Sequence, residues 1–170
     1  MATAVTPIEE YLAKTWRPDR EYIDGEIRER HLGEFDHADL QTALAAWLRS
    51  RRKHWTVRVV VEQRVQVQPT RFRIPDVAVI DGDSAIEAVI THPPLICIEV
   101  LSKDDPITRM KDRINDYAAF GVPDIWFFDP ELRGVWICRP DSMHWMTEGI
   151  LHATGAEIAI PLHEIWDDLG

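Results

Sequence analysis

The chain has 170 residues, of which 45% are hydrophobic and 28% charged, and it carries a net charge of −10 at pH 7. This length predicts one domain covering residues 1–170, and the composition is that of a globular protein, which excludes a disordered chain. The acidic charge argues against a general nucleic-acid coat protein. The sequence has no apolar run of ~18–20 residues and no signal-peptide pattern, so we expect a cytoplasmic location.

Three elements are predicted in the first third of the chain. Residues 6–15 open with the Thr-x-x-Glu spacing of a capping box and predict a short helix. Residues 21–28 alternate around an Asp-Gly pair, which is typical of a β-hairpin. Residues 35–53 repeat apolar side chains at helical spacing and predict a long helix, with His37 on the same face. A histidine in this position is either a hydrogen-bonded packing residue or a residue that faces an active site.

Basic residues gather at the end of this helix and beyond it. Between Arg49 and Arg73 the chain has eight basic residues and one acid, a net charge of +7. Such asymmetry is compatible with a phosphate-facing patch, which would track a nucleic-acid backbone. The alternative is a solvated helix end favoured by the helix dipole. The candidate nucleic-acid-binding residues are Arg49, Arg51, Arg52, Lys53 and Arg58.

Strand-like runs dominate the middle of the chain. Residues 55–61 and 63–68 predict a meander of antiparallel strands that leads into the β-branched run 74–80. Residues 95–101 are apolar at odd and even positions alike, which predicts a central strand covered on both faces.

Each of the last two runs contains one carboxylate, Asp76 or Glu99. Burying an unpaired charge costs several kcal/mol, so each carboxylate needs a partner. Two carboxylates that converge on neighbouring strands form a hard-oxygen site suited to Mg²⁺ or Mn²⁺, and their repulsion raises one pKa. The alternative is a structural ion pair with an arginine such as Arg73.

A second helix is expected between residues 104 and 121, opened by Asp-Asp-Pro and closed by glycine. Its predicted buried stripe is formed by Ile107, Met110, Ile114, Tyr117 and Ala118. Residues placed every 100° put Lys111 at the edge of this stripe and Arg113 further round the helix.

The last third of the chain predicts more sheet. Residues 125–128 and 135–138 read as a strand and its hairpin partner, and residues 161–166 as a short helical turn. Cys97 and Cys138 lie in expected strands without CxxC spacing, which favours reduced core residues over a disulfide or zinc site.

Several segments resemble one family. They are EYIDGE (residues 21–26), RIPDVAVI (73–80), IEVLS (98–102) and DYAAFGVPDIWFFDP (116–130), together with His37 in the first long helix. In this order and spacing the sequence resembles the Uma-two family of restriction-endonuclease-like proteins, a branch of the PD-(D/E)XK nuclease superfamily. The resemblance covers nearly the whole chain.

The resemblance implies an α/β (α+β) fold with a restriction-endonuclease-like core, in which a central mixed β-sheet is flanked by helices. It also implies a metal-dependent endonuclease that hydrolyses phosphodiester bonds in nucleic acid, with DNA favoured over RNA. Asp76 and Glu99 would be the acidic pair that binds Mg²⁺ (or Mn²⁺), and a homodimer is compatible with the resemblance. The alternative function is a catalytically impaired nuclease fold that binds nucleic acid or protein.

The catalytic cation is the point at which the sequence departs from the superfamily. The usual lysine, two residues after the glutamate, is replaced by Leu101, and family members carry it in the following helix. The family's slot there falls on Arg113, whereas the helix's lysine is Lys111. Arginine stabilises developing charge but cannot act as a base, while lysine can do either. The resemblance also suggests that Glu21 or His37 completes the site.

Overall fold

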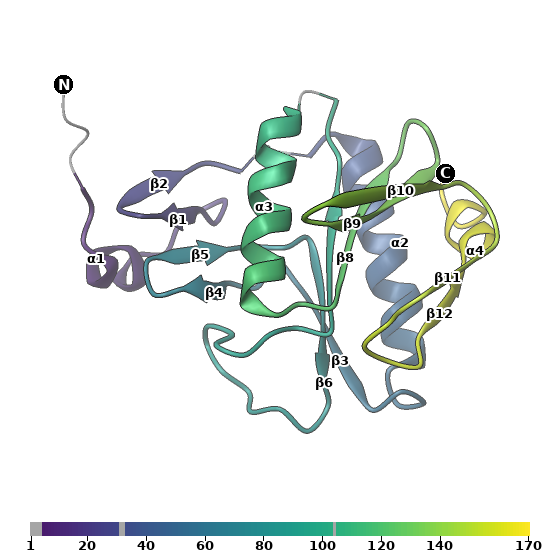
Figure 1. Ribbon diagram of the computed structural model, residues 1–170, viewed down its shortest axis with the longest axis horizontal. Helices are drawn as coiled ribbons and strands as arrows, with labels where there is room; N and C mark the ends of the chain where they lie inside the picture. The colour runs from purple at the N-terminus through teal and green to yellow at the C-terminus, as the bar shows by residue number, and fades with distance from the viewer. Residues whose placement is uncertain (1–4, 31–32, 104) are drawn as a thin grey trace.

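The computed structural model describes residues 5–30, 33–103 and 105–170 (Figure 1). Four helices are described, α1 (Ile8–Ala13), α2 (Phe35–Arg51), α3 (Ile107–Phe120) and α4 (Leu162–Trp166). The described strands are β1 (Glu21–Ile23), β2 (Glu26–Arg28), β3 (Val57–Val61), β4 (Val65–Gln68), β5 (Arg71–Arg73), β6 (Val77–Asp81), β7 (Ile96–Val100), β8 (Asp124–Asp129), β9 (Gly134–Arg139), β10 (Ser142–Met146), β11 (Ile150–His152) and β12 (Ala159–Pro161).

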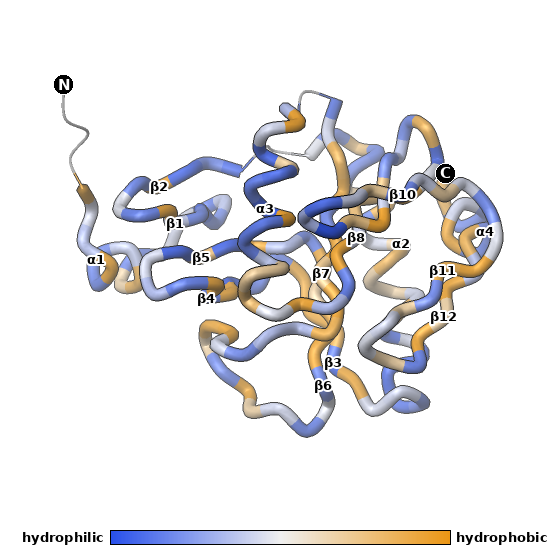
Figure 2. Tube along the Cα trace, in the orientation of Figure 1, coloured by the Kyte–Doolittle hydropathy of each residue, from blue (hydrophilic) through white to orange (hydrophobic). Residues whose placement is uncertain are grey.

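A mixed sheet with the strand order β10-β9-β8-β7-β6-β3 forms the centre of the molecule. Helix α2 packs on one face of this sheet and α3 on the other (Figure 1). Hydrophobic residues concentrate in β3, β6 and β7, whereas β1 and β5 are mostly hydrophilic (Figure 2). The expected α/β fold with a central mixed sheet flanked by helices is confirmed.

Strand β7 lies in the interior of the central sheet, between β6 and β8. All five of its residues are buried, because Ile96 and Ile98 pack on the side of α2 while Cys97 packs on the side of α3. It is parallel to β8, to which α3 connects it, and antiparallel to β6. The prediction of a central strand covered on both faces is therefore confirmed.

Helix α3 ends as predicted but exposes more of its first turns than expected. Gly121 adopts a left-handed conformation with φ 103°, which lets the chain turn after the last helical residue. Ile107 is 68% exposed, so the buried stripe begins at Met110 and the prediction for Ile107 was wrong. Lys111 is exposed and does not point inward. The predicted start at Asp104 lies outside the described residues.

A second sheet, in the order β2-β1-β5-β4, stands beside the central one. The hairpin of β1 and β2 is confirmed, and its turn residues Asp24 and Gly25 both have positive φ, 50° and 95°. Helix α1 covers this sheet through Tyr11, which packs against Tyr22 and Phe72.

Two predictions near these elements were wrong. Helix α1 begins at Ile8 without a side-chain cap, because Thr6 is held by the hairpin: its N–H donates to the carbonyl of Gly25 at 2.9 Å. The predicted meander is also absent from the described residues. Strand β3 pairs with β6 and β4 with β5, because Glu62, at φ 51°, redirects the chain between them into the second sheet.

The remaining predicted elements agree with the structure. Strands β8 and β9 form the expected hairpin, and α4 is the expected short helical turn. Cys97 and Cys138 are buried free thiols. None of the helices in the described part of the chain is long and apolar enough to cross a membrane.

Candidate active site

Asp76 lies just before β6, and its side chain is 4% exposed. Its Oδ1 accepts a hydrogen bond from Arg30 Nη2 at 2.7 Å, and its Oδ2 accepts one from the backbone N–H of Val100 at 2.7 Å. The strand register pairs Val77 with Ile98, and one further residue along this register places Asp76 opposite Glu99. The two predicted acidic residues therefore lie side by side, Glu99 on β7 and Asp76 directly before the neighbouring strand β6.

Glu99 faces α3 from the buried strand β7. Its Oε1 accepts a hydrogen bond from the hydroxyl of Tyr117 at 2.6 Å, and its Oε2 accepts one from Arg113 Nη1 at 2.7 Å. Met110, Ile114 and Tyr117 form the buried face of α3 against the sheet, so the packing of the helix brings both donors to the carboxylate.

Glu21, on β1, is the third buried carboxylate of the site. Its Oε1 lies 3.3 Å from Arg113 Nη2 and accepts a hydrogen bond from the N–H of Ile74 at 3.2 Å. Its Oε2 accepts a hydrogen bond from Arg73 Nη1 at 3.0 Å. Arg113 is thus the cation shared by Glu21 and Glu99, and the expectation that Glu21 completes the site agrees with this geometry.

Burial and repulsion raise the pKa of the Glu99 carboxyl. Burial raises the pKa of its carboxyl to about 7, although the charge of Arg113 lowers it, and the nearby charge of Asp76 raises it further. The predicted raised pKa of one member of the acidic pair therefore falls on Glu99.

The other two carboxyls remain ionised. Burial by itself would raise the pKa of Asp76, but the hydrogen bond and charge of His37 and the charge of Arg30 hold it below its usual value. Burial also opposes ionisation of Glu21, and its two arginine partners lower its pKa below the usual range. Each anion survives in the core because a cation faces it.

His37 is at the site and does not serve packing alone. Its Nε2 lies 3.3 Å from Oδ2 of Asp76, and its side chain is 13% exposed. Burial lowers the pKa of the imidazole, but the hydrogen bond and charge of Asp76 outweigh this effect and raise it above the usual value. Gln41, one turn further along α2, donates to the backbone carbonyl of Asp76 at 3.1 Å.

The structure separates the two candidate cations on α3. Arg113 contacts two buried carboxylates, whereas Lys111 is exposed and lines a different surface depression, which also contains Arg139. The catalytic role of either residue stays a prediction, but the geometry favours Arg113.

The predicted basic run lies away from this site. His37 is in the first turn of α2 and Arg49 is twelve residues later, which corresponds to about 18 Å along a helix.

Most residues of the basic run already have partners nearby. Arg49 donates to the backbone carbonyl of Val59, Arg52 to that of Arg49, and Arg58 to that of Ser84. Arg51 pairs with Glu164 and stacks on Trp47, while Lys53 is exposed beyond the end of the helix. These contacts match the solvated-helix-end alternative, and nucleic-acid binding by the run stays a prediction.

Two partners of the acidic pair were not predicted, and a third was assigned differently. Nothing in the local sequence marks Arg30, which reaches Asp76 from 46 residues away. Tyr117 was expected only as a packing residue of its helix, although it belongs to the segment that resembles the family. Arg73, the example given for the ion-pair alternative, pairs with Glu21 and Asp116 instead. The arginines that pair with Asp76 and Glu99 are Arg30 and Arg113.

The donor set of the acidic pair fits a hard divalent cation. Oδ1 of Asp76 and both oxygens of Glu99 each accept one hydrogen bond and so keep a second lone pair, whereas Oδ2 of Asp76 faces both the N–H of Val100 and His37 Nε2. Mg²⁺ binds through one or two carboxylates together with waters and substrate phosphate. Within residues 5–30, 33–103 and 105–170, no three His, Cys, Asp or Glu side chains are arranged to hold a metal ion.

The sequence model of the Uma2 family, described as "Putative restriction endonuclease", matches residues 8–168, and the chain therefore belongs to this family. A comparison with functionally curated proteins gave no match.

Two solved structures resemble this chain to different degrees. One is described as a "putative nuclease belonging to DUF820" from Anabaena variabilis ATCC 29413. It superposes with a TM-score of 0.82 and 21% identity, over 96% of this chain and 98% of that chain, which establishes the fold. The DrdV–DNA complex, solved by cryo-EM, is similar over 74% of this chain and 10% of its own, at 13% identity and a TM-score of 0.42, too weak a likeness to carry an argument.

Proposed function

We propose that this protein is a metal-dependent endonuclease that hydrolyses phosphodiester bonds in DNA at the site formed by Asp76 and Glu99. The observation that supports the proposal is the pairing of two buried carboxylates across adjacent strands, one of which has its pKa raised to about 7. Such a pair is unfavourable when both groups are ionised, and a divalent cation reverses this effect.

Asp76 and Glu99 would hold Mg²⁺ or Mn²⁺, which supplies an activated water and neutralises charge on the scissile phosphate. The protein's own groups position this pair. The N–H of Val100 and the imidazole of His37 orient Asp76, and the hydroxyl of Tyr117 orients Glu99. A carboxylate with fixed oxygens needs little reorganisation when it binds a ligand.

Arg113 would stabilise the negative charge that develops on the phosphate. Its guanidinium is permanently charged and is held by Glu21 and Glu99 at the edge of the acidic pair. Because arginine does not give up its proton, this site would not use the helix cation as a general base.

The second candidate is a nuclease fold that binds nucleic acid without cleaving it. The observation in its favour is that all four oxygens of the acidic pair accept hydrogen bonds from protein groups, two of them from Arg30 and Arg113. These ion pairs stabilise the site without a metal, so a metal must compete with them.

Cleavage of supercoiled plasmid and of single-stranded DNA and RNA, in Mg²⁺, Mn²⁺ or chelator, tests the proposal. We expect cleavage of DNA that requires a divalent cation and is lost in Asp76→Asn. Nicking that persists in chelator or in Asp76→Asn would contradict the proposed site. Binding without cleavage in every metal would support the second candidate.

A further inference from the structure

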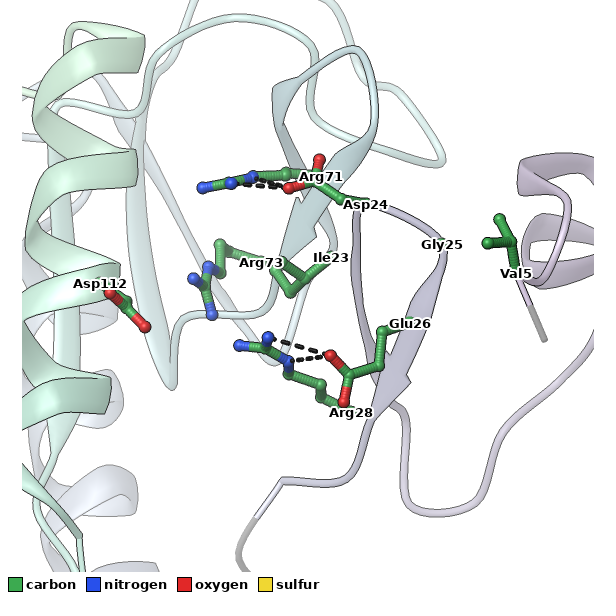
Figure 3. Close-up of a pocket in the computed structure, with 9 residues that line it drawn as sticks. All are labelled: Val5, Ile23, Asp24, Gly25, Glu26, Arg28, Arg71, Arg73 and Asp112. Atoms are coloured by element: carbon green, nitrogen blue, oxygen red, sulfur yellow. Dashed lines mark hydrogen bonds and ion pairs between the residues drawn. The ribbon is translucent and has the colours of Figure 1, made fainter. Parts of the chain in front are cut away.

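A cavity of about 360 Å³ opens between the β1–β2 hairpin, β5 and α3. Three arginines, Arg28, Arg71 and Arg73, extend into it from the sheet (Figure 3). Figure 3 shows their guanidinium groups on the same side, facing α3, from which Asp112 points toward them. No role in the proposed chemistry accounts for this arrangement.

Strand pairing places these arginines on one face. Arg71 and Arg73 are two residues apart on β5, so their side chains project to the same side. Arg28 is paired with Glu21 on β1, and the register of β1 with β5, extended by one residue, places Arg73 opposite Glu21. Neighbouring strands are about 4.8 Å apart, so Arg28 and Arg73 stand about 10 Å apart with Glu21 between them.

At the mouth of the cavity, Arg28 is the arginine whose charge is only loosely compensated. Arg28 pairs with Glu26 on its own strand, and the two side chains are 36% and 56% exposed. Arg71 is held more firmly, because it pairs with Asp24 and also, at 2.9 Å, with the buried Asp116. Exposed ion pairs such as Arg28–Glu26 are weak, so an anion can compete with Glu26 for Arg28.

Arg28 also retains a donor. The hydrogen bonds among the described residues use Nε and Nη2 of Arg28 and leave its Nη1 out. A guanidinium can bind a phosphate through two parallel N–H groups, whereas Nε and Nη2 of Arg28 both donate to the same oxygen of Glu26.

The cavity is connected to the acidic pair through shared partners. Arg73 lines the cavity and binds Glu21, and Glu21 contacts Arg113, which binds Glu99. A strand whose scissile phosphate lies at Glu99 would therefore reach the cavity with a neighbouring phosphate.

We infer that the cavity of Arg28, Arg71 and Arg73 is a phosphate subsite for the nucleic-acid strand next to the cleavage point. This inference rests on the proposed function. Arg28 would contact the phosphate at the mouth, with Arg71 beside it. The buried Arg73 is neutralised by Glu21 and Asp116, so it would form the wall of the cavity and not a further phosphate contact. Asp112 opposes the anion and weakens its binding.

Binding of fluorescein-labelled DNA, as a single strand and as a duplex, tests the subsite when measured by anisotropy in chelator over a series of salt concentrations. Arg28→Gln should weaken binding about tenfold at low salt, since a charge-assisted hydrogen bond is lost. It should also reduce the slope of log affinity against log salt by about 0.7–0.9, the value of one phosphate contact. Glu26→Gln and Asp112→Asn should tighten binding, because each removes an anion that competes with or repels the phosphate.

Lys111→Gln is the matched control, because it removes one positive charge from an exposed residue of α3 that lies outside the cavity. Its loss of affinity should be smaller than that of Arg28→Gln. Equal losses in these two variants, or unchanged affinity in both Glu26→Gln and Asp112→Asn, would overturn the subsite. Inorganic phosphate should displace the labelled DNA less well than unlabelled oligonucleotide at an equal concentration of phosphate groups. Equal displacement by the two would mean that the ligand is not a nucleic-acid strand.

Cleavage is measured separately in Mg²⁺ and Mn²⁺. A wild type that binds DNA through Arg28 but cleaves nothing would refute the proposed function alone. A wild type that cleaves DNA and is indifferent to Arg28→Gln would refute the subsite alone.

Discussion

Replacement of Glu99 by glutamine should change the pH dependence of stability in the metal-free protein. Burial, with the charge of Asp76 adding to it, raises the pKa of Glu99 from 4.5 to about 7. Between these two values the folded protein holds a proton that the unfolded chain has lost, so the free energy of unfolding falls as pH rises. At ~1.4 kcal/mol per pH unit, this group costs the folded state about 3 kcal/mol above pH 7.

Glutamine resembles the protonated carboxyl and cannot ionise, so Glu99→Gln should escape this loss. Urea unfolding in chelator at pH 5 and at pH 8 measures the effect. The unfolding free energy of the variant minus that of wild type should be about 3 kcal/mol larger at pH 8 than at pH 5. His37, whose pKa is also raised, contributes pH dependence of the same sign to both proteins. The charge of Glu99 is a minor cause of that shift, so most of the difference between the two proteins belongs to Glu99 itself.

Glu21→Gln is the control, because Glu21 is equally buried but has its pKa lowered and is ionised at both pH values. Its destabilisation should therefore be the same at pH 5 and pH 8. If the difference between Glu99→Gln and wild type is also independent of pH, then Glu99 is ionised throughout this range and our account of the acidic pair is wrong.

Four other substitutions test the remaining contacts. Under saturating Mg²⁺, Arg113→Met should reduce the cleavage rate by ~10²–10³ while Lys111→Met leaves it unchanged, and equal rates for the two variants would exclude the helix cation from the mechanism. Asp76→Asn should lose the metal-dependent rise in melting temperature. Because it leaves Arg30 with only the exposed Glu62, 3.7 Å away, as an anionic partner, it should also lower the unfolding free energy by about 1–3 kcal/mol in chelator. An unaltered melting temperature would mean that Arg30 finds another partner. Tyr117→Phe should cost about 1 kcal/mol in urea unfolding for its lost hydrogen bond, and no change would show that this bond contributes little.

Local patterns in the sequence determined the elements and the identity of the acidic pair. The Asp-Gly turn, the helical spacing of residues 35–51 and the glycine after α3 act over a few residues, and each appears in the structure as predicted. The same holds for Glu99, since a carboxylate within a fully apolar run is anomalous whatever lies around it.

Only the tertiary structure decided which charges meet. Arg30 reaches Asp76 across 46 residues of sequence, and Arg113 reaches Glu21 because α3 packs beside both sheets. Periodicity had placed Lys111 at the edge of the buried stripe. In the structure, the rotation of α3 about its axis that buries Met110 turns Lys111 to the solvent. Periodicity defines a face only to within such an angle, and the packing of the helix on the sheet fixes the rest.

The pairing of the strands was decided in the same way. The local sequence of β3 and β4 marks both as strands, but their partners, β6 and β5, come later in the chain and lie in different sheets. That division carries Arg71 and Arg73 away from the basic run at the end of α2 and into the cavity beside Glu21. Charge counted along the sequence cannot separate these arginines, because their distance from the acidic pair depends on which strands share hydrogen bonds.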